Sequence, residues 1–129
     1  MELVVTTRNN GALPDLPADC AVEVSSFIGA AGARAISFGP LKPAQRGWLQ
    51  VMKNMELCVE EAAVTGDYGL LLQAFILNPL IPSGDDARQV LDELLIAHEK
   101  YLPKFADKIN ELKKKGVMPK DSVVRELMK

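Results

Sequence analysis

The sequence predicts an α+β fold, in which a small antiparallel sheet is covered by helices. Alternating apolar and polar residues are confined to the first forty positions, and apolar residues at steps of three and four fill the remainder. The change falls near Pro40–Pro43. We expect about three strands within residues 2–38 and three to five helices within residues 43–128. Three strands with one apolar face need a helical cover, which the second half supplies.

Three segments of the first part have the pattern of strands. They are residues 2–7, 20–28 and 34–38, separated by turn-forming residues. The face of the second segment that is expected to be buried carries Val22, Val24, Ser26 and Ile28. Gly29–Gly32 predicts a hairpin turn between the last two strands, because glycine accepts turn conformations that other residues avoid.

The helices of the second part are predicted from their apolar stripes and end signals. The first runs from Pro43 to about Thr65, with Gly66 as its stop. Asp67 caps a second helix that ends near Asn78, because Pro79 disfavours helical geometry in the residue before it. The stripe expected on the first helix contains Trp48, Met52, Met55, Val59 and Ala62 or Ala63.

A third helix is expected to begin near Asp85 and to be broken or kinked at Pro103. Pro119 then starts a short terminal helix that ends at Leu127–Met128. Lys113–Lys115 precede Gly116, where cations favour the negative end of a helix. This basic run is therefore interpreted as a helix end and not as a phosphate site.

Composition excludes several classes of function. The chain has 129 residues, a length typical of one domain, and a net charge of -2, which offers no field to attract nucleic acid. Two isolated cysteines, Cys20 and Cys58, and the single His98 cannot form a zinc site. No signal peptide and no apolar run of about 20 residues occurs. We therefore expect a cytoplasmic protein that binds neither nucleic acid nor membranes.

No catalytic set is visible in the chain. Glycine-rich phosphate loops and a G-x-S-x-G elbow are both missing from the sequence. His98 stands beside Glu99, but neighbours on a helix point in different directions, so a packing or surface role is preferred. Glu60–Glu61 and Asp85–Asp86 are interpreted as a solvated helix face and a helix start. We predict no catalytic, cofactor-binding or metal-binding residue.

Arg8, Asn9 and Asn10 form the one polar cluster with the position of a binding site. They follow the first strand directly and precede a turn, where scaffolds commonly present functional side chains. The alternative is that Asn10–Gly11 only makes the turn and leaves Arg8 exposed. The sequence leaves both interpretations open.

Four segments, in order, resemble the final part of family 4 glycoside hydrolases. They are RNNGALPDLP at residues 8–17 with the following AVEV, LCVEEAAVTGD at 57–67, LNPL at 77–80 and AHEKYLPKF at 97–105. The last segment is similar to the 6-phospho-β-glucosidase branch. The match covers about residues 5–115.

The resemblance implies a redox glycosidase with a lactate/malate-dehydrogenase-like fold. Such enzymes use NAD and a divalent metal, typically manganese, to oxidise the sugar at C3, eliminate the glycosidic oxygen and add water; this family is an exception to two-carboxylate hydrolysis. The substrates would be phosphorylated β-glucosides or disaccharides. The NAD loop, the metal ligands and the tyrosine base belong upstream of the segment that matches residue 1.

The resemblance therefore implies a C-terminal domain fragment, residues 1–129, without the N-terminal NAD-binding domain and inactive alone. Its β-rich part would be residues 1–40 and its helical part residues 41–129. An apolar face left uncovered would make it a homo-oligomer. The alternatives are another family 4 specificity, such as 6-phospho-α-glucosidase or α-galactosidase, and a free-standing assembly module that kept the fold without the catalysis.

Overall fold

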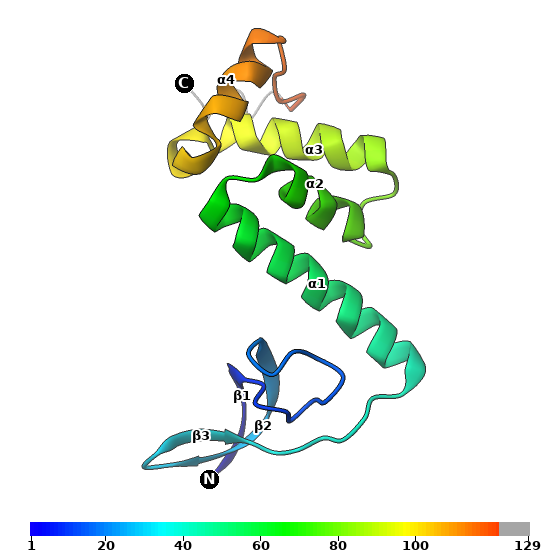
Figure 1. Ribbon diagram of the computed structural model, residues 1–129, viewed down its shortest axis with the longest axis vertical. Coiled ribbons are helices and arrows are strands. Elements are labelled where there is room, and N and C mark those ends of the chain that lie inside the picture. The colour runs from blue at the N-terminus through cyan, green and yellow to red at the C-terminus, as the bar shows by residue number, and fades with distance from the viewer. Residues whose placement is uncertain (122–129) are drawn as a thin grey trace. The chain divides into compact units, whose positions relative to one another are not determined.

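The computed structural model describes residues 1–121 and confirms the α+β fold class (Figure 1). The chain forms two compact units, residues 1–53 and residues from 54 onward. The expected single domain 1–129 stays a prediction. Within the described residues, no helix is long and apolar enough to cross a membrane. The predicted terminal helix ending at Leu127–Met128 lies outside the described residues.

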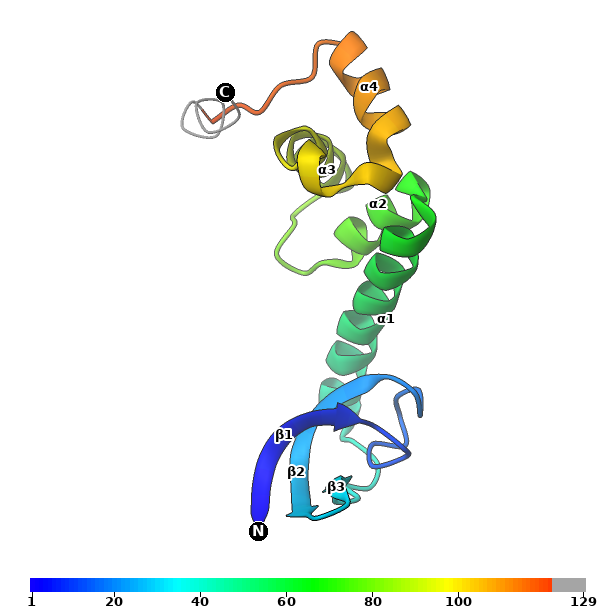
Figure 2. The ribbon, with the colours of Figure 1, turned by 90° about the vertical axis from the view of Figure 1, so that its left-hand side faces the viewer.

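The sheet has three antiparallel strands in the order β1-β2-β3: β1 Glu2–Arg8, β2 Ala21–Gly29 and β3 Gly32–Ala35 (Figure 2). The predicted hairpin is confirmed, since Gly29 pairs with Gly32. The third strand was predicted to reach Phe38, which is wrong. The Phe38 N–H donates to the Ala12 carbonyl at 2.8 Å, so the chain has left β2 by that point to bond with a loop.

The core of the first unit lies on one face of β2, as the alternation predicted. Val22, Val24 and Ser26 are buried there, while Glu23 is exposed. Leu13 and Leu16, from the loop between β1 and β2, pack on this face. The loop therefore contributes to the core and does not merely connect two strands.

The second unit is helical. Its helices are α1 Pro43–Thr65, which begins in the first unit, α2 Tyr68–Leu77, α3 Gly84–Ala97 and α4 Ala106–Lys114, with 3₁₀ turns η1 Glu99–Tyr101 and η2 Pro103–Phe105. Their apolar side chains form one core around Ala62, Leu91, Leu95, Ile96, Phe105, Ile109 and Leu112. The expected number of helices is thus confirmed within residues 43–121.

The predicted helix ends are confirmed at several places. Gly66 adopts a φ of 79° after α1, and the Asp67 carboxylate accepts from the Leu70 N–H at 3.0 Å at the start of α2. Lys113 and Lys114 occupy the last turn of α4, before Gly116 at a φ of 77°. These signals were readable because each depends on a few consecutive residues.

One helical expectation needs correction. The third helix ends at Ala97, well before Pro103, and the intervening residues form η1. The apolar stripe expected on α1 is present but largely uncovered: Trp48 is 59% exposed, and within α1 only Ala62 is fully buried. A periodic stripe identifies a helix, but it does not say how much of the stripe is covered.

Candidate functional site

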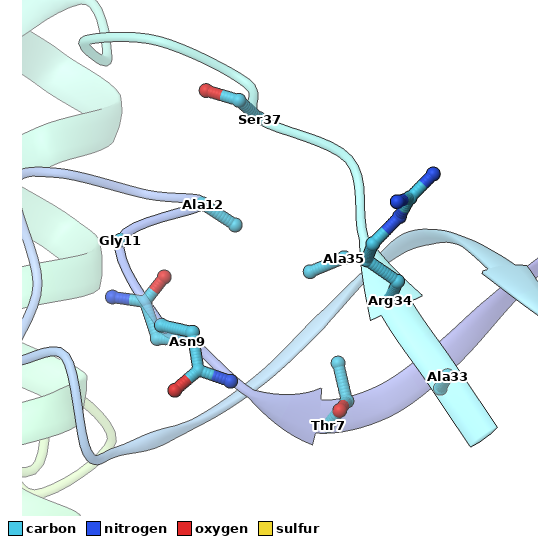
Figure 3. Close-up of a pocket in the computed structure, with 9 residues that line it drawn as sticks. Thr7, Asn9, Gly11, Ala12, Ala33, Arg34, Ala35 and Ser37 are labelled. Carbon is cyan, nitrogen blue, oxygen red and sulfur yellow. The ribbon is translucent and has the colours of Figure 1, made fainter. Parts of the chain in front are cut away.

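A polar pocket of about 260 Å³ lies beside the end of β1 (Figure 3). It is formed by the end of β1, the turn that follows, β3 and the chain leaving β3. Its lining consists of Thr7, Asn9, Asn10, Gly11, Ala12, Ala33, Arg34, Ala35 and Ser37. The sequence singled out Asn9 and Asn10, and the structure brings both to this pocket. Arg8, the third residue of the predicted cluster, is exposed and does not line it.

Asn9 holds the loop that forms one wall of the pocket. Its side chain is completely buried, and Nδ2 lies 2.9, 3.1 and 2.9 Å from the carbonyl oxygens of Leu13, Leu16 and Pro17. The Leu13 N–H donates to Oδ1 at 2.8 Å. Both ends of the amide are therefore engaged by backbone, so Asn9 shapes the pocket and has no free donor to offer a ligand.

Asn10 and Gly11 make the turn that the sequence suggested. Their φ angles are 47° and 83°, and the Ala12 N–H donates to the Asn9 carbonyl at 2.9 Å. A turn with positive φ at both central residues favours asparagine followed by glycine. The Asn10 side chain is exposed, so within this cluster it is the amide that remains available to a ligand.

The pocket is polar, and one charged residue is among those that line it. Arg34 lines it, yet its guanidinium points away from Thr7 and Asn9 (Figure 3). The remaining polar side chains are the hydroxyls of Thr7 and Ser37 and the amide of Asn10. These groups can form hydrogen bonds with a neutral polar ligand. None is placed as a general acid, a general base or an activated nucleophile.

Sequence reasoning missed Thr7 and Ser37. Each is an isolated hydroxyl without a motif, and they meet only because the β2–β3 hairpin and the Phe38–Ala12 hydrogen bond return the chain to the end of β1. No local signal marks either residue. Proximity of this kind depends on strand pairing over a long sequence separation.

Two titratable groups outside the pocket, Tyr68 and His98, form local hydrogen bonds. Burial, and then a 2.7 Å hydrogen bond to Asp92 Oδ1, raise the pKa of Tyr68 to about 12. A phenol of this pKa stays protonated at neutral pH and is a poor base. His98 caps the end of α3 and lies exposed, with Nδ1 3.0 Å from the Leu94 carbonyl oxygen. Its predicted surface role fits this position.

Comparison with known proteins places the chain in a family. The model of the Family 4 glycosyl hydrolase C-terminal domain matches residues 1–81. The chain belongs to the family 4 glycosyl hydrolases. A probable 6-phospho-β-glucosidase of Bacillus subtilis (strain 168) is 48% identical over 105 residues, which cover 81% of this chain and 24% of that protein. The chain thus spans about a quarter of that relative's length.

Solved structures agree with this assignment. The 6-phospho-β-glucosidase of Thermotoga maritima, solved with manganese, NAD⁺ and glucose-6-phosphate, matches with a TM-score of 0.70 and 29% identity over 78% of this chain and 25% of that chain. A 6-phospho-α-glucosidase from gut microorganisms, in complex with NAD and glucose-6-phosphate, gives a TM-score of 0.77 and 29% identity over 80% and 23%. The resemblance inferred from the four segments is confirmed.

The described residues of this family 4 chain do not form a site for the cofactors bound in those structures. Among residues 1–121, no group of three or more His, Cys, Asp or Glu side chains is arranged to hold a metal ion. The sequence also lacks a glycine-rich dinucleotide loop. NAD and manganese are bound in related family 4 structures. No step of the chemistry is therefore assigned to a cofactor held by the described residues.

Proposed function

We propose that this chain is the C-terminal domain of a 6-phospho-β-glucosidase, an enzyme that hydrolyses phosphorylated β-glucosides with NAD and a divalent metal. The observation that carries the proposal is the 48% identity to the Bacillus subtilis relative over four fifths of this chain. The described residues provide a polar pocket lined by no carboxylate or imidazole, and no group of three or more His, Cys, Asp or Glu among them is arranged to hold a metal ion. The chain alone is therefore expected to be inactive.

Within that enzyme, the pocket would hold part of the substrate through neutral hydrogen bonds. Asn10, Thr7 and Ser37 offer an amide and two hydroxyls, which match the hydroxyl groups of a sugar more closely than its phosphate. Arg8 is exposed at the end of β1 and precedes the turn directly. We propose Asn10 as the direct contact, Arg8 as a contact to the charged end of the substrate, and Asn9 as the residue that positions the turn.

Another family 4 specificity is the second candidate. The gut 6-phospho-α-glucosidase aligns with a higher TM-score than the Thermotoga maritima 6-phospho-β-glucosidase, so the backbone does not separate the two anomeric preferences. A free-standing assembly module is a third candidate. Its support is that residues 1–53 and the residues from 54 onward each contain a hydrophobic core.

A chimera tests these candidates. The last quarter of the Bacillus subtilis relative is replaced by this chain, and hydrolysis of chromogenic 6-phospho-β- and 6-phospho-α-glucosides is measured with NAD and Mn²⁺. We expect activity on the β substrate from the chimera and none from this chain alone. A chimera that folds, by circular dichroism, but hydrolyses neither substrate would favour the assembly module.

The same chimera tests the substrate contacts. Asn10→Gly keeps the positive φ and removes the amide, so the loss of one hydrogen bond should raise KM by roughly two- to tenfold. Arg8→Gln should raise KM for the phosphorylated substrate. Asn110→Gly, at an exposed position of α4, is the control for a general loss of stability. Unchanged KM values for Asn10→Gly and Arg8→Gln would remove this part of the proposal.

We further propose that the protein is cytoplasmic and self-associates. Cys20 and Cys58 are free thiols, as expected in a reducing compartment. Self-association is supported by exposed apolar side chains on the first unit, among them Val4, Phe38 and Trp48. Light scattering of the purified chain across a concentration series tests it.

A further inference from the structure

The outer edge of β1 is an open strand edge. β1 stands at one end of the strand order, and no strand among the described residues pairs with its outer side (Figure 2). It is seven residues long, whereas β3 at the other edge has four. Strand edges are ordinarily protected by shortness, lysine, proline or a bulge, because they template further pairing. β3 is protected by its shortness, and β1 contains neither lysine nor proline.

The hydrogen bonds to β2 show which backbone groups of β1 are free. The Ile28 N–H donates to the Met1 carbonyl at 2.8 Å, and the Asn9 N–H donates to the Cys20 carbonyl at 2.9 Å. Hydrogen-bonded positions alternate along an antiparallel pair, so the odd-numbered residues of β1 bond to β2. The residues that direct their N–H and C=O outward are Glu2, Val4, Thr6 and Arg8.

We propose that two copies of this chain pair through their β1 strands, antiparallel about a two-fold axis at Val5. In this register Glu2 lies opposite Arg8 of the second copy, and Val4 lies opposite Thr6. Every outward-facing residue then meets an outward-facing residue, so each such pair can exchange both hydrogen bonds. A second copy is a suitable occupant because a two-fold pairing matches the strand to itself.

Charge favours the same occupant and the same register. Glu2 and Arg8 stand at opposite ends of β1, both are exposed, and they carry opposite charges. Antiparallel pairing in full overlap places Glu2 of each copy beside Arg8 of the other, so the dimer contains two such pairs. Opposite charges directly across a strand pair stabilise the pairing. Parallel pairing in register would instead place Glu2 beside Glu2. The exposed Leu3 and Val4, 46% and 63% accessible, would lose apolar surface to water.

This inference deepens the self-association proposed above and rests on it, but it needs no glycosidase activity. The test uses sedimentation and native mass spectrometry of the full chain. Glu2→Arg creates two facing arginine pairs per dimer, and Arg8→Glu creates two facing glutamate pairs. Each variant alone should raise the dimer Kd on the order of tenfold or more. Mixing the two variants should restore a dimer, now containing one copy of each, because every facing pair is again opposite in charge.

Arg34→Glu is the matched control, since it makes the same charge change on β3. It should leave the dimer Kd unchanged. Circular dichroism checks that every variant is folded. Variants that self-associate like the wild type, or a mixture without a heterodimer, would overturn the pairing of β1 while leaving self-association standing. A wild-type chain that stays monomeric would overturn both the β1 pairing and the proposed self-association. The edge of β1 would then be available to pair with a strand of a longer protein.

Discussion

Gly66→Ala should destabilise the helical unit more than any other glycine-to-alanine change among the described residues. Gly66 has a φ of 79°, and a Cβ placed there would lie 2.5 Å from the Lys104 carbonyl oxygen. The left-handed conformation costs about 1–2 kcal/mol for a residue with a Cβ. Forcing a backbone neighbour aside adds about 1–3 kcal/mol. Alanine also lowers the conformational freedom of the unfolded chain, which stabilises the folded state by about 0.4–1 kcal/mol. We expect a loss of about 1–5 kcal/mol in the free energy of unfolding.

The measurement is urea unfolding followed by far-UV circular dichroism, with two control variants. Gly116→Ala carries a similar φ of 77° and meets nothing within 4 Å, so it reports the conformational cost alone, about 1 kcal/mol. Gly47→Ala lies inside α1 with open space around it and should stabilise by about 0.5–1 kcal/mol. If Gly66→Ala costs no more than Gly116→Ala, the close approach to Lys104 does not exist in solution.

Two other predictions concern hydrogen-bonded side chains, one buried and one partly buried. Asn9→Ala removes the acceptor of the Leu13 N–H and the donor to three carbonyls, so it should destabilise by about 2 kcal/mol and speed amide exchange at Leu13; slow exchange there would contradict the role of Asn9. Asp92→Asn should lower the pKa of Tyr68 from about 12 toward 10.0, measured by ultraviolet titration in a Tyr101→Phe background. Because folding raises the pKa of Tyr68, the protonated phenol stabilises the folded state fully below pH 10, and this contribution is lost as the pH rises toward 12. Tyr68→Phe should remove this loss of stability at high pH. A pH dependence of stability that the substitution leaves unaltered would refute the prediction.

Local signals predicted elements of both units. The alternation of β2, the Asp67 cap and the stop at Gly66 were all correct. Each depends on side chains within a few residues of one another, where steric and hydrogen-bonding preferences act without help from the rest of the chain. The turn at Asn10–Gly11 was readable for the same reason.

The polar cluster at Arg8–Asn10 shows where such reasoning stops. Three consecutive polar side chains looked alike in the sequence, yet Asn9 is buried among backbone carbonyls and Asn10 faces outward. The distinction arises because the loop from Leu13 to Pro17 folds back over Asn9. A side chain whose partners are brought together by the loop's own course cannot be assigned from its neighbours in sequence.

The α+β class and the membership of a glycosidase family could be predicted from the sequence, because periodicity and ordered motifs are one-dimensional properties. Three features become visible only in the folded chain: β3 ends early, Thr7 and Ser37 share a pocket with Asn10, and no strand among residues 1–121 pairs with the outer edge of β1, whose ends carry opposite charges. These features depend on hydrogen bonds between distant segments, whose geometry is set only when the chain has folded.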